Sequence, residues 1–160
     1  MTPAPTLRDS ARVPMCEMRV GDRWLSRGRT ITEADVVAFA GLTGDFHPQH
    51  TDATFAATSP FGERLAHGML VLSYAFGLVP SEHAVAVRRI RNVVFKRPVL
   101  IGDTIAVETT IARLQPMSGG VGLVTGSWRV LNQRGLAVAK LEIDALWQQD
   151  WPATETAAAR

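Results

Sequence analysis

The longest apolar run of the chain extends from Met69 to Val79. In a helix of this sequence, apolar side chains point in nearly every direction, which a helix on the protein surface does not tolerate. A run of this length is also too short to cross a bilayer, which takes about 20 residues. The pattern therefore predicts a buried central helix around which the rest of the chain packs.

A shorter helix is expected ahead of the central one. Thr32 suits the N-cap position, and Asp35 stands three residues later as the acidic form of a capping box. The helix should stop between Gly41 and Gly44, because glycines favour helix ends. Its apolar stripe consists of Val36, Val37, Phe39 and Ala40.

A second short helix is expected to begin near Asp52. The Asp52 side chain would cap its first turn, and the helix would bring Phe55 inward. The Ser-Pro-Phe-Gly sequence at residues 59–62 then breaks the chain before the central helix. The helical part of the sequence thus ends at the apolar run.

After Pro80 the pattern changes from helices to strands. Residues 104–114 alternate most cleanly, with Ile105, Val107 and Ile111 facing one way. The sequence Asn-Gln-Arg-Gly at 132–135 is a strong turn signal. The expected strands cover residues 85–96, 104–114, 122–131 and 136–147, with a short strand near 21–26.

Helices followed by several antiparallel strands predict an α+β fold, with one long helix packed on a curved antiparallel sheet. The 160 residues suffice for one domain with its own core. We expect a flexible N-terminal segment at residues 1–14, a folded domain at 15–150 and a flexible tail at 151–160. A long terminal strand would leave an open sheet edge that needs a partner or protection.

Composition and charge bear on the expected cellular location and on the expected binding partners. Cys16 is the only cysteine, which excludes an internal disulfide and fits a reducing compartment. Residues 1–14 lack the apolar block of a signal peptide, so we expect a cytoplasmic protein. A net charge of +2 gives no reason to expect nucleic acid or a membrane as a partner.

Candidate chemistry is concentrated around the start of the central helix, because three of the four histidines lie between residues 44 and 79. Gly44 and Pro48 oppose helix continuation, so Asp45, His47 and His50 are expected on irregular backbone. A turn there could bring the Asp45 carboxylate and the His50 imidazole onto one water molecule as a general acid and base. The alternative is a carboxylate that caps a turn and a histidine on a surface loop.

The same stretch resembles a known family. Its pattern Gly-Asp-x-Asn-Pro-x-His-x-Asp, a Phe-Gly loop, Ala-His-Gly-Met, and then Arg-Pro-Val with Gly-Asp-Thr is similar to that of MaoC-like dehydratases and (R)-specific enoyl-CoA hydratases. The resemblance covers residues 19–148, and His47 departs from it by standing where the family has Asn. The matching residues are Gly44, Asp45, Pro48, His50, Asp52, Phe61, Gly62, Ala66, His67, Gly68, Met69, Arg97, Pro98, Val99, Gly102, Asp103 and Thr104.

The resemblance implies a single hotdog fold, in which the sheet wraps the central helix, and a homodimer whose two sheets join edge to edge. It implies addition or removal of water at the C2–C3 bond of an enoyl or 3-hydroxyacyl thioester. The acyl group would be carried by coenzyme A or an acyl carrier protein, and no cofactor beyond that carrier is implied.

The resemblance also assigns catalytic roles to three residues. Asp45 and His50 would hold the reacting water. Gly68, in the first turn of the central helix, would offer its N–H to the thioester oxygen on which negative charge builds. In the alternative reading, Gly68 only permits tight packing of the helix.

Further residues of the matching segments are expected to contact the substrate: His47, Phe61, His67, Met69 and Arg97. His67 is better suited to capping the helix, or to supporting the Gly68 N–H, than to chemistry. His47 is either a tolerated substitution for Asn or a sign of an altered substrate, because imidazole offers a donor or an acceptor where an amide offers both.

One basic cluster stands out, composed of Arg88, Arg89, Arg91, Lys96 and Arg97. It is either a solvated strand face that protects a sheet edge or a surface that attracts the phosphates of coenzyme A or an acidic acyl carrier protein. The four tryptophans lie outside the cluster, which disfavours nucleic acid.

Two other functions stay open. A hotdog thioesterase would share the fold and the substrate class but would release free thiol, and a non-catalytic acyl-thioester binder would show no turnover. A metal site built from Asp45, His47, His50 and His67 is not expected, because the group contains no cysteine and its loop spacing fits no standard zinc pattern.

Overall fold

The computed structural model of the chain describes residues 13–80 and 82–150. A single antiparallel sheet holds its strands in the order β1-β4-β5-β6-β3, and β2 also pairs with β4. The strands are β1 (Arg23–Leu25), β2 (Arg29–Thr30), β3 (Ala84–Phe95), β4 (Thr104–Pro116), β5 (Val121–Leu131) and β6 (Ala137–Gln148). The helices are η1 (Met15–Glu17), α1 (Glu33–Thr43), α2 (Pro48–Thr51), α3 (Ala53–Thr58) and α4 (Gly68–Leu78).

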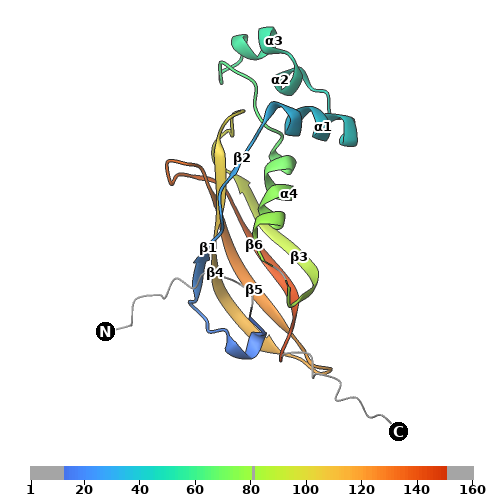
Figure 1. Cartoon of the computed structure of the whole chain (residues 1–160), viewed down its shortest axis with the longest axis vertical. Helices are drawn as coiled ribbons and strands as arrows, with labels where there is room; N and C mark the ends of the chain where they lie inside the picture. Colours follow the sequence, from blue (N-terminus) through green and yellow to red (C-terminus); the bar gives the residue numbers. More distant parts are fainter. Residues whose placement is uncertain (1–12, 81, 151–160) are drawn as a thin grey trace.

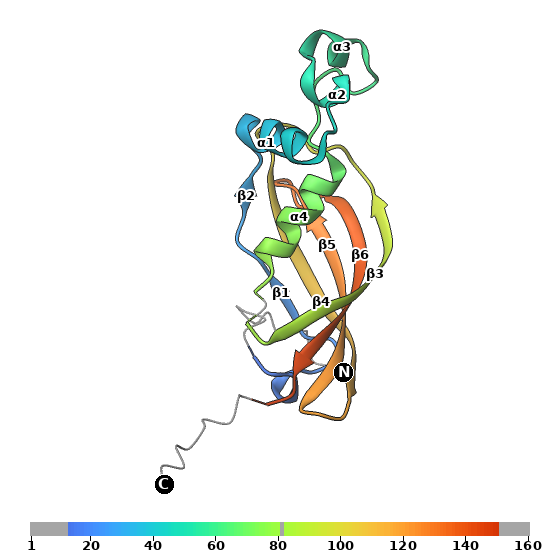
Figure 2. The ribbon, with the colours of Figure 1, turned by 90° about the vertical axis from the view of Figure 1, so that its right-hand side faces the viewer.

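The core lies between α4 and the face of the sheet that curves around it (Figures 1 and 2). This arrangement confirms the expected α+β fold with a central helix on a curved sheet. The burial of α4 is one-sided, however, because Met69 is 59% exposed and Ser73 and Gly77 also face outward. Buried residues of the core include Leu70, Val71, Leu72 and Ala75 of α4 and Val107, Ile111, Val130, Leu141 and Ile143 of the sheet.

Helix α1 begins with the capping box that the sequence predicts. The Asp35 N–H donates to the Thr32 hydroxyl at 3.3 Å, and the Asp35 carboxylate accepts from the Thr32 N–H at 2.8 Å. Gly44 ends the helix at a φ of 77°, a left-handed conformation that glycine adopts without steric cost. Both ends of this helix were therefore predicted correctly.

The Asp35 carboxylate also joins α1 to the rest of the fold. It accepts hydrogen bonds from the Tyr74 hydroxyl of α4 and from the Arg29 guanidinium of β2. Burial of Asp35 opposes its ionisation, but the bonds from Tyr74 and Thr32 and the charge of Arg29 outweigh this and lower its pKa to about 2. The start of α1 is thus held by charge-assisted hydrogen bonds.

The segment between α1 and α4 corrects two expectations. Pro48 does not keep the backbone irregular but begins α2 at its first position, where its missing N–H has no intrahelical role. Asp52 caps α3 as expected, accepting from the N–H groups of Thr54 and Phe55. The Phe55 side chain does not turn inward, since it is 44% exposed. Figures 1 and 2 show α2 and α3 beyond the end of the sheet, where no strand lies behind them.

The strands occur close to the expected bounds, and Ile105, Val107 and Ile111 are buried on one face of β4 as predicted. The open edge belongs to β3 and not to the last strand, because β6 lies between β5 and β3. Large apolar side chains are exposed along this edge strand: Val85, Val87, Ile90, Val93, Val94 and Phe95.

Residues 1–12 and 151–160, which include most of the two expected flexible ends, lie outside the described residues. Val13 and Pro14 belong to the folded part, because Pro14 is buried and the Val13 carbonyl accepts from the Trp147 indole N–H at 2.9 Å. The domain boundary predicted at residue 15 is therefore slightly late. Within the described chain, no helix has the length and apolar character needed to cross a membrane.

Candidate active site

A cavity of about 640 Å³ lies at the N-terminal end of α4. Its walls come from α1, the loop after it, α2, the segment before α4, the α4 terminus, the end of β3 with the loop that follows, and the start of β6. Most of the lining is apolar, and a few polar side chains converge on it, as is usual in small-molecule sites. The lining residues are Phe39, Thr43, Asp45, His50, Phe61, Leu65, Ala66, His67, Gly68, Met69, Val71, Phe95, Lys96, Arg97, Pro98, Val99 and Val138.

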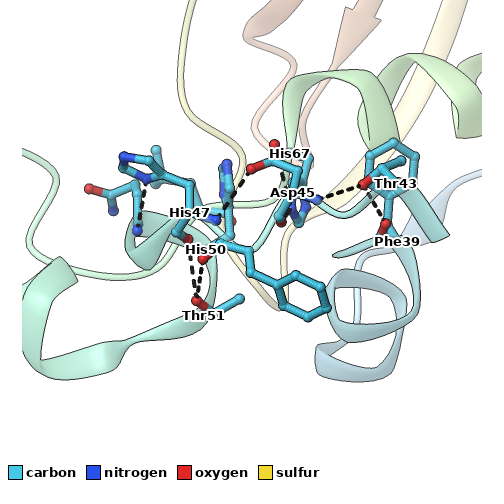
Figure 3. Close-up of polar contacts among 10 residues, drawn as sticks. Phe39, Thr43, Asp45, His47, His50, Thr51 and His67 are labelled. Carbon is cyan, nitrogen blue, oxygen red and sulfur yellow. Dashed lines mark hydrogen bonds and ion pairs between the residues drawn. The ribbon is translucent and has the colours of Figure 1, made fainter. Parts of the chain in front are cut away.

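Asp45 reaches the cavity because Gly44 turns the chain out of α1. Its N–H donates to the Thr43 hydroxyl at 3.3 Å, and that hydroxyl donates to the Phe39 carbonyl at 2.7 Å. The Asp45 side chain is 51% exposed, and its carboxylate accepts from the His47 N–H at 3.3 Å. Figure 3 shows this chain of contacts. The carboxylate is therefore accessible to a ligand while its backbone is held.

His50 lies on α2 and is held by the backbone of a distant segment. Its Nδ1 lies 2.8 Å from the Leu65 carbonyl oxygen. A carbonyl only accepts, so Nδ1 carries the proton and, in the neutral ring, Nε2 has the free lone pair. Gln49 supports the same contact, because its carbonyl accepts from the Leu65 N–H at 3.2 Å and its side chain donates to the Glu63 carbonyl at 2.9 Å.

His67 lies beneath both of these residues and is only 2% exposed. Its Nε2 donates to the Asp45 carbonyl oxygen at 3.0 Å, and its ring stacks on that of His50 with centroids 3.9 Å apart. Although His67 occupies the N-cap position of α4, its side chain makes no capping hydrogen bond within the described chain. The expected capping role is therefore wrong, and the side chain instead supports the catalytic candidates.

Gly68 is the first residue of α4, so its N–H has no carbonyl one turn earlier to bond. A Cβ at this position would lie 2.9 Å from the Phe95 ring. A side chain at residue 68 would therefore make the Phe95 ring shift, so packing is one reason for glycine at this position. That packing leaves the helix N-terminus, with its partial positive charge, facing the cavity.

His47 is absent from the cavity wall, which leaves the expected substrate contact without support in the structure. Its Nδ1 accepts from the Gln49 N–H at 3.1 Å and so caps α2. Its ring lies edge-on to that of Phe55, with the ring centroids 6.0 Å apart. An Asn at this position could cap the helix through its carbonyl oxygen in the same way. His47 thus differs from the family's Asn in residue type but still caps the helix.

The other expected substrate contacts, Phe61, Met69 and Arg97, line the cavity. Arg97 is anchored by a hydrogen bond of 2.7 Å from its Nη1 to the Ala137 carbonyl. The basic cluster divides: Lys96 and Arg97 face the cavity, whereas Arg91 forms ion pairs with Asp144 and Glu142 on the sheet.

Asp45, His50 and His67 also have the composition of a metal site. One oxygen of Asp45 and one ring nitrogen of each histidine lie within 4.8 Å of one another. Nε2 of His67 is occupied by its bond to the Asp45 carbonyl, so only the buried Nδ1 atom would be left for a metal. The spacing suits a shared water instead, since two groups bonded to one water lie about 4.5 Å apart.

The sequence missed most of the apolar wall, including Phe39, Val71, Phe95, Val99 and Val138. It also missed the Leu65 carbonyl that orients His50, because a backbone oxygen leaves no trace in residue type. The neighbouring match to the family pattern at Arg97 was the one signal that could have pointed to Phe95 and Lys96.

Comparison with known proteins gives a consistent match. The model of the MaoC like domain matches residues 18–127. The chain is 43% identical over 100 residues to the protein MaoC of Klebsiella aerogenes, covering 61% of this chain and 30% of that protein. It is 40% identical over 96 residues to a 3-hydroxybutyryl-CoA dehydratase of Methylorubrum extorquens (55% and 57% covered). It is 37% identical over 95 residues to an (R)-specific enoyl-CoA hydratase of Rhodospirillum rubrum (57% and 65% covered). The matches thus span less than two thirds of the length of these curated relatives.

Solved structures match over most of the chain. A monoamine oxidase regulatory protein from Archaeoglobus is 37% identical with a TM-score of 0.78, covering 92% of this chain and 99% of that one. An (R)-hydratase from A. caviae is 28% identical with a TM-score of 0.68, covering 81% and 96%. A Mycobacterium tuberculosis protein with a double hotdog fold, 20% identical with a TM-score of 0.77 over 88% of this chain and 45% of that one, shows that the fold is the hotdog.

Proposed function

Because the chain belongs to the family of proteins with a MaoC-like domain, we propose that it adds water to, or removes water from, the C2–C3 bond of an enoyl or 3-hydroxyacyl thioester. The observation that carries the proposal is the convergence of Asp45 and His50 on one cavity at the N-terminus of the buried helix α4. Relatives named as a 3-hydroxybutyryl-CoA dehydratase and an (R)-specific enoyl-CoA hydratase support the same reaction class.

In the hydration direction, one water molecule is held between the Asp45 carboxylate and Nε2 of His50. The Leu65 carbonyl fixes the proton of His50 on Nδ1, so Nε2 can accept a proton from the water. The water oxygen bonds to C3, and the electrons of the double bond move toward the thioester oxygen. The proton taken up by the pair returns to C2 on the same face, and dehydration is the reverse.

The Gly68 N–H stabilises the negative charge on the thioester oxygen. It stands at the positive end of the α4 dipole and faces a mostly apolar cavity, where such an interaction is stronger than in water. The Phe95 ring against Gly68 keeps this end of the helix covered on one side. No cofactor beyond the thioester carrier takes part in the proposed reaction.

The carrier is coenzyme A or the phosphopantetheine of an acyl carrier protein. Lys96 and Arg97 are the cationic side chains of the cavity wall and would meet its phosphate groups. Arg97 is already oriented by the Ala137 carbonyl. The cytoplasmic location, and the expectation of neither nucleic acid nor membrane as a partner, stay predictions.

The reaction is tested with crotonyl-coenzyme A, following the loss of enoyl absorbance and, in parallel, the release of free thiol. Loss of absorbance without thiol, abolished in Asp45→Asn, is the expected result. Release of thiol would replace the proposal with a thioesterase. Binding of acyl thioesters without turnover, on coenzyme A and on an acyl carrier protein alike, would leave a non-catalytic binding protein.

We also propose that the protein forms a homodimer in which β3 joins β3 of a second copy. Six large apolar side chains are exposed along β3, which in a single chain forms an open sheet edge. A second antiparallel strand would cover them and satisfy the edge. Light scattering coupled to gel filtration should give twice the mass of the chain, and a mass of one chain at micromolar concentration would contradict this.

A further inference from the structure

We propose that His67 is a positioning residue that sets the geometry of both catalytic candidates at once. Its Nε2–H holds the backbone of Asp45, and its ring supports the ring of His50 by stacking. The inference rests on the proposed function, and it gives a part in the reaction to a buried side chain other than the two catalytic candidates. Figure 3 shows His67 together with Asp45 and His50.

The need for such a residue follows from the exposure of Asp45. Half of its side chain faces solvent, and the bond that its carboxylate accepts from the His47 N–H is long, at 3.3 Å. The bond from His67 to the Asp45 carbonyl is shorter, at 3.0 Å. The loop therefore depends on a buried side chain of another segment to place the carboxylate.

The tautomer of His67 follows from the same bond. A carbonyl oxygen can only accept, so Nε2 carries the proton and Nδ1 has a lone pair. Within the described chain, the buried Nδ1 atom finds no hydrogen-bond partner.

An unpaired buried acceptor destabilises a fold, and a residue that keeps one calls for an explanation. Glutamine could donate to the Asp45 carbonyl but has no flat face for His50. Phenylalanine has the face but no donor. Histidine combines both in one side chain, which explains its presence despite the unpaired Nδ1.

The stacking has a consequence for the reaction. When His50 takes the proton from water, its ring becomes a cation whose centroid lies 3.9 Å from that of the His67 ring. The face of an aromatic ring attracts a cation. His67 therefore holds His50 in place in both of its protonation states.

The experiment separates the two contacts. His67→Phe keeps a ring and removes the donor, and His67→Gln keeps a donor and removes the ring. Each should lower kcat for crotonyl-coenzyme A hydration about 100-fold, as expected for displaced catalytic groups, with KM changed less than about 3-fold. His83→Gln is the matched control, since His83 is also buried but lies outside the cavity; it should lower thermal stability and leave kcat near the wild-type value.

A second measurement is independent of turnover. Nitrogen-15 NMR of the imidazoles in the wild-type protein should show a proton on Nε2 of His67, because this atom donates to the Asp45 carbonyl. The Nδ1–H tautomer would overturn the inference.

The kinetic outcomes also distinguish the inference from the function on which it rests. A wild-type protein silent on all thioesters would overturn the proposed function and the positioning role with it. An active wild type with an equally active His67→Phe or His67→Gln would overturn the positioning role alone. Loss of thermal stability in these variants without loss of kcat would do the same, because a purely structural role predicts it.

Discussion

The sheet with α4 and the segment from residue 44 to residue 65 place their side chains by different means. The sheet relies on long backbone ladders and a contiguous apolar core. Of residues 44–65, all of which the structure describes, Ala56 alone is buried. That segment is held by single hydrogen bonds, among them those to the Leu65 carbonyl and the Asp45 carbonyl. Substitutions in the first region should therefore act on stability, and those in the second on turnover.

The largest effect is expected at Asp45. Asp45→Asn should lower kcat about 1,000-fold, because the amide can neither take up a proton nor orient the water as a carboxylate does. Its half-exposed side chain makes little contribution to the core, so the melting temperature should stay within about 2 °C of wild type. Steady-state hydration and differential scanning calorimetry provide the two numbers. A stability loss comparable to that of a core variant would erase the contrast between the regions.

The converse change is made in the sheet. Ile105 of β4 is fully buried, and Ile105→Ala should lower the free energy of unfolding by about 3 kcal/mol. Because no atom of Ile105 lines the cavity, kcat of the remaining folded protein should stay within about 2-fold of wild type. Urea unfolding measures the change in stability, and steady-state kinetics measure kcat per folded molecule. A large fall in kcat would mean that core packing also determines the geometry of the active site.

Gly68 lies where the two regions meet, so a change there should affect both. Gly68→Ala places a Cβ 2.9 Å from the Phe95 ring and should cost about 1 to 3 kcal/mol of stability. It should also lower kcat, because the helix terminus has to shift. The double variant Gly68→Ala/Phe95→Ala has no such clash, so its free energy of unfolding should be no lower than that of Phe95→Ala alone. An equal loss in both backgrounds would contradict the packing explanation.

A smaller effect is expected from Asp35, which joins α1, the helix that leads into residues 44–65, to Tyr74 of α4 and Arg29 of β2. Its pKa is about 2 in the folded protein against 3.8 as the reference value, so the folded state favours the ionised form. The resulting stability is present above pH 3.8 and is lost as the pH falls toward 2. Because solvent screens the charge of Arg29, the contribution of ionised Asp35 to the free energy of unfolding should be about 1 to 2 kcal/mol. Asp35→Asn should lose this stability at pH 7 and show a flatter pH dependence between pH 4 and pH 2 in urea titrations.

The smallest effect is expected at His47. His47→Asn keeps an acceptor for the Gln49 N–H, so stability should change by less than about 0.5 kcal/mol and kcat by less than about 3-fold. His47→Ala removes the cap and should cost about 1 kcal/mol. A comparison of short and bulky acyl thioesters completes the test, because a changed substrate preference in His47→Asn would show that this residue selects the substrate.

Features decided by neighbouring residues were predictable from the sequence. The Thr32 capping box, the glycine end of α1, the Asp52 cap and the alternation of β4 all follow from residues within one turn or one strand. The catalytic candidates were found by residue type and by the family resemblance, and the structure brings Asp45, His50 and Gly68 to one cavity.

Features decided by contacts between distant segments were not predictable. The Leu65 carbonyl that orients His50 is a backbone atom 15 residues away. The Phe95 ring that requires glycine at position 68 comes from the end of another element. The sequence likewise placed Phe55 inside and His47 at the substrate, because nothing in residue type shows that α2 and α3 extend beyond the sheet.

The pairing of β3 with β6 also determines when the site can form during synthesis. Phe95 pairs with Ala139, 44 residues later in the chain, whereas Asp45 and His50 have already been made. At about 5 to 20 residues per second, a ribosome needs several seconds to produce that partner. For that interval the apolar residues of β3 and the inner face of α4 lack their sheet. The protein is therefore most exposed to aggregation and to chaperones just before β6 emerges, and the cavity can form only afterwards.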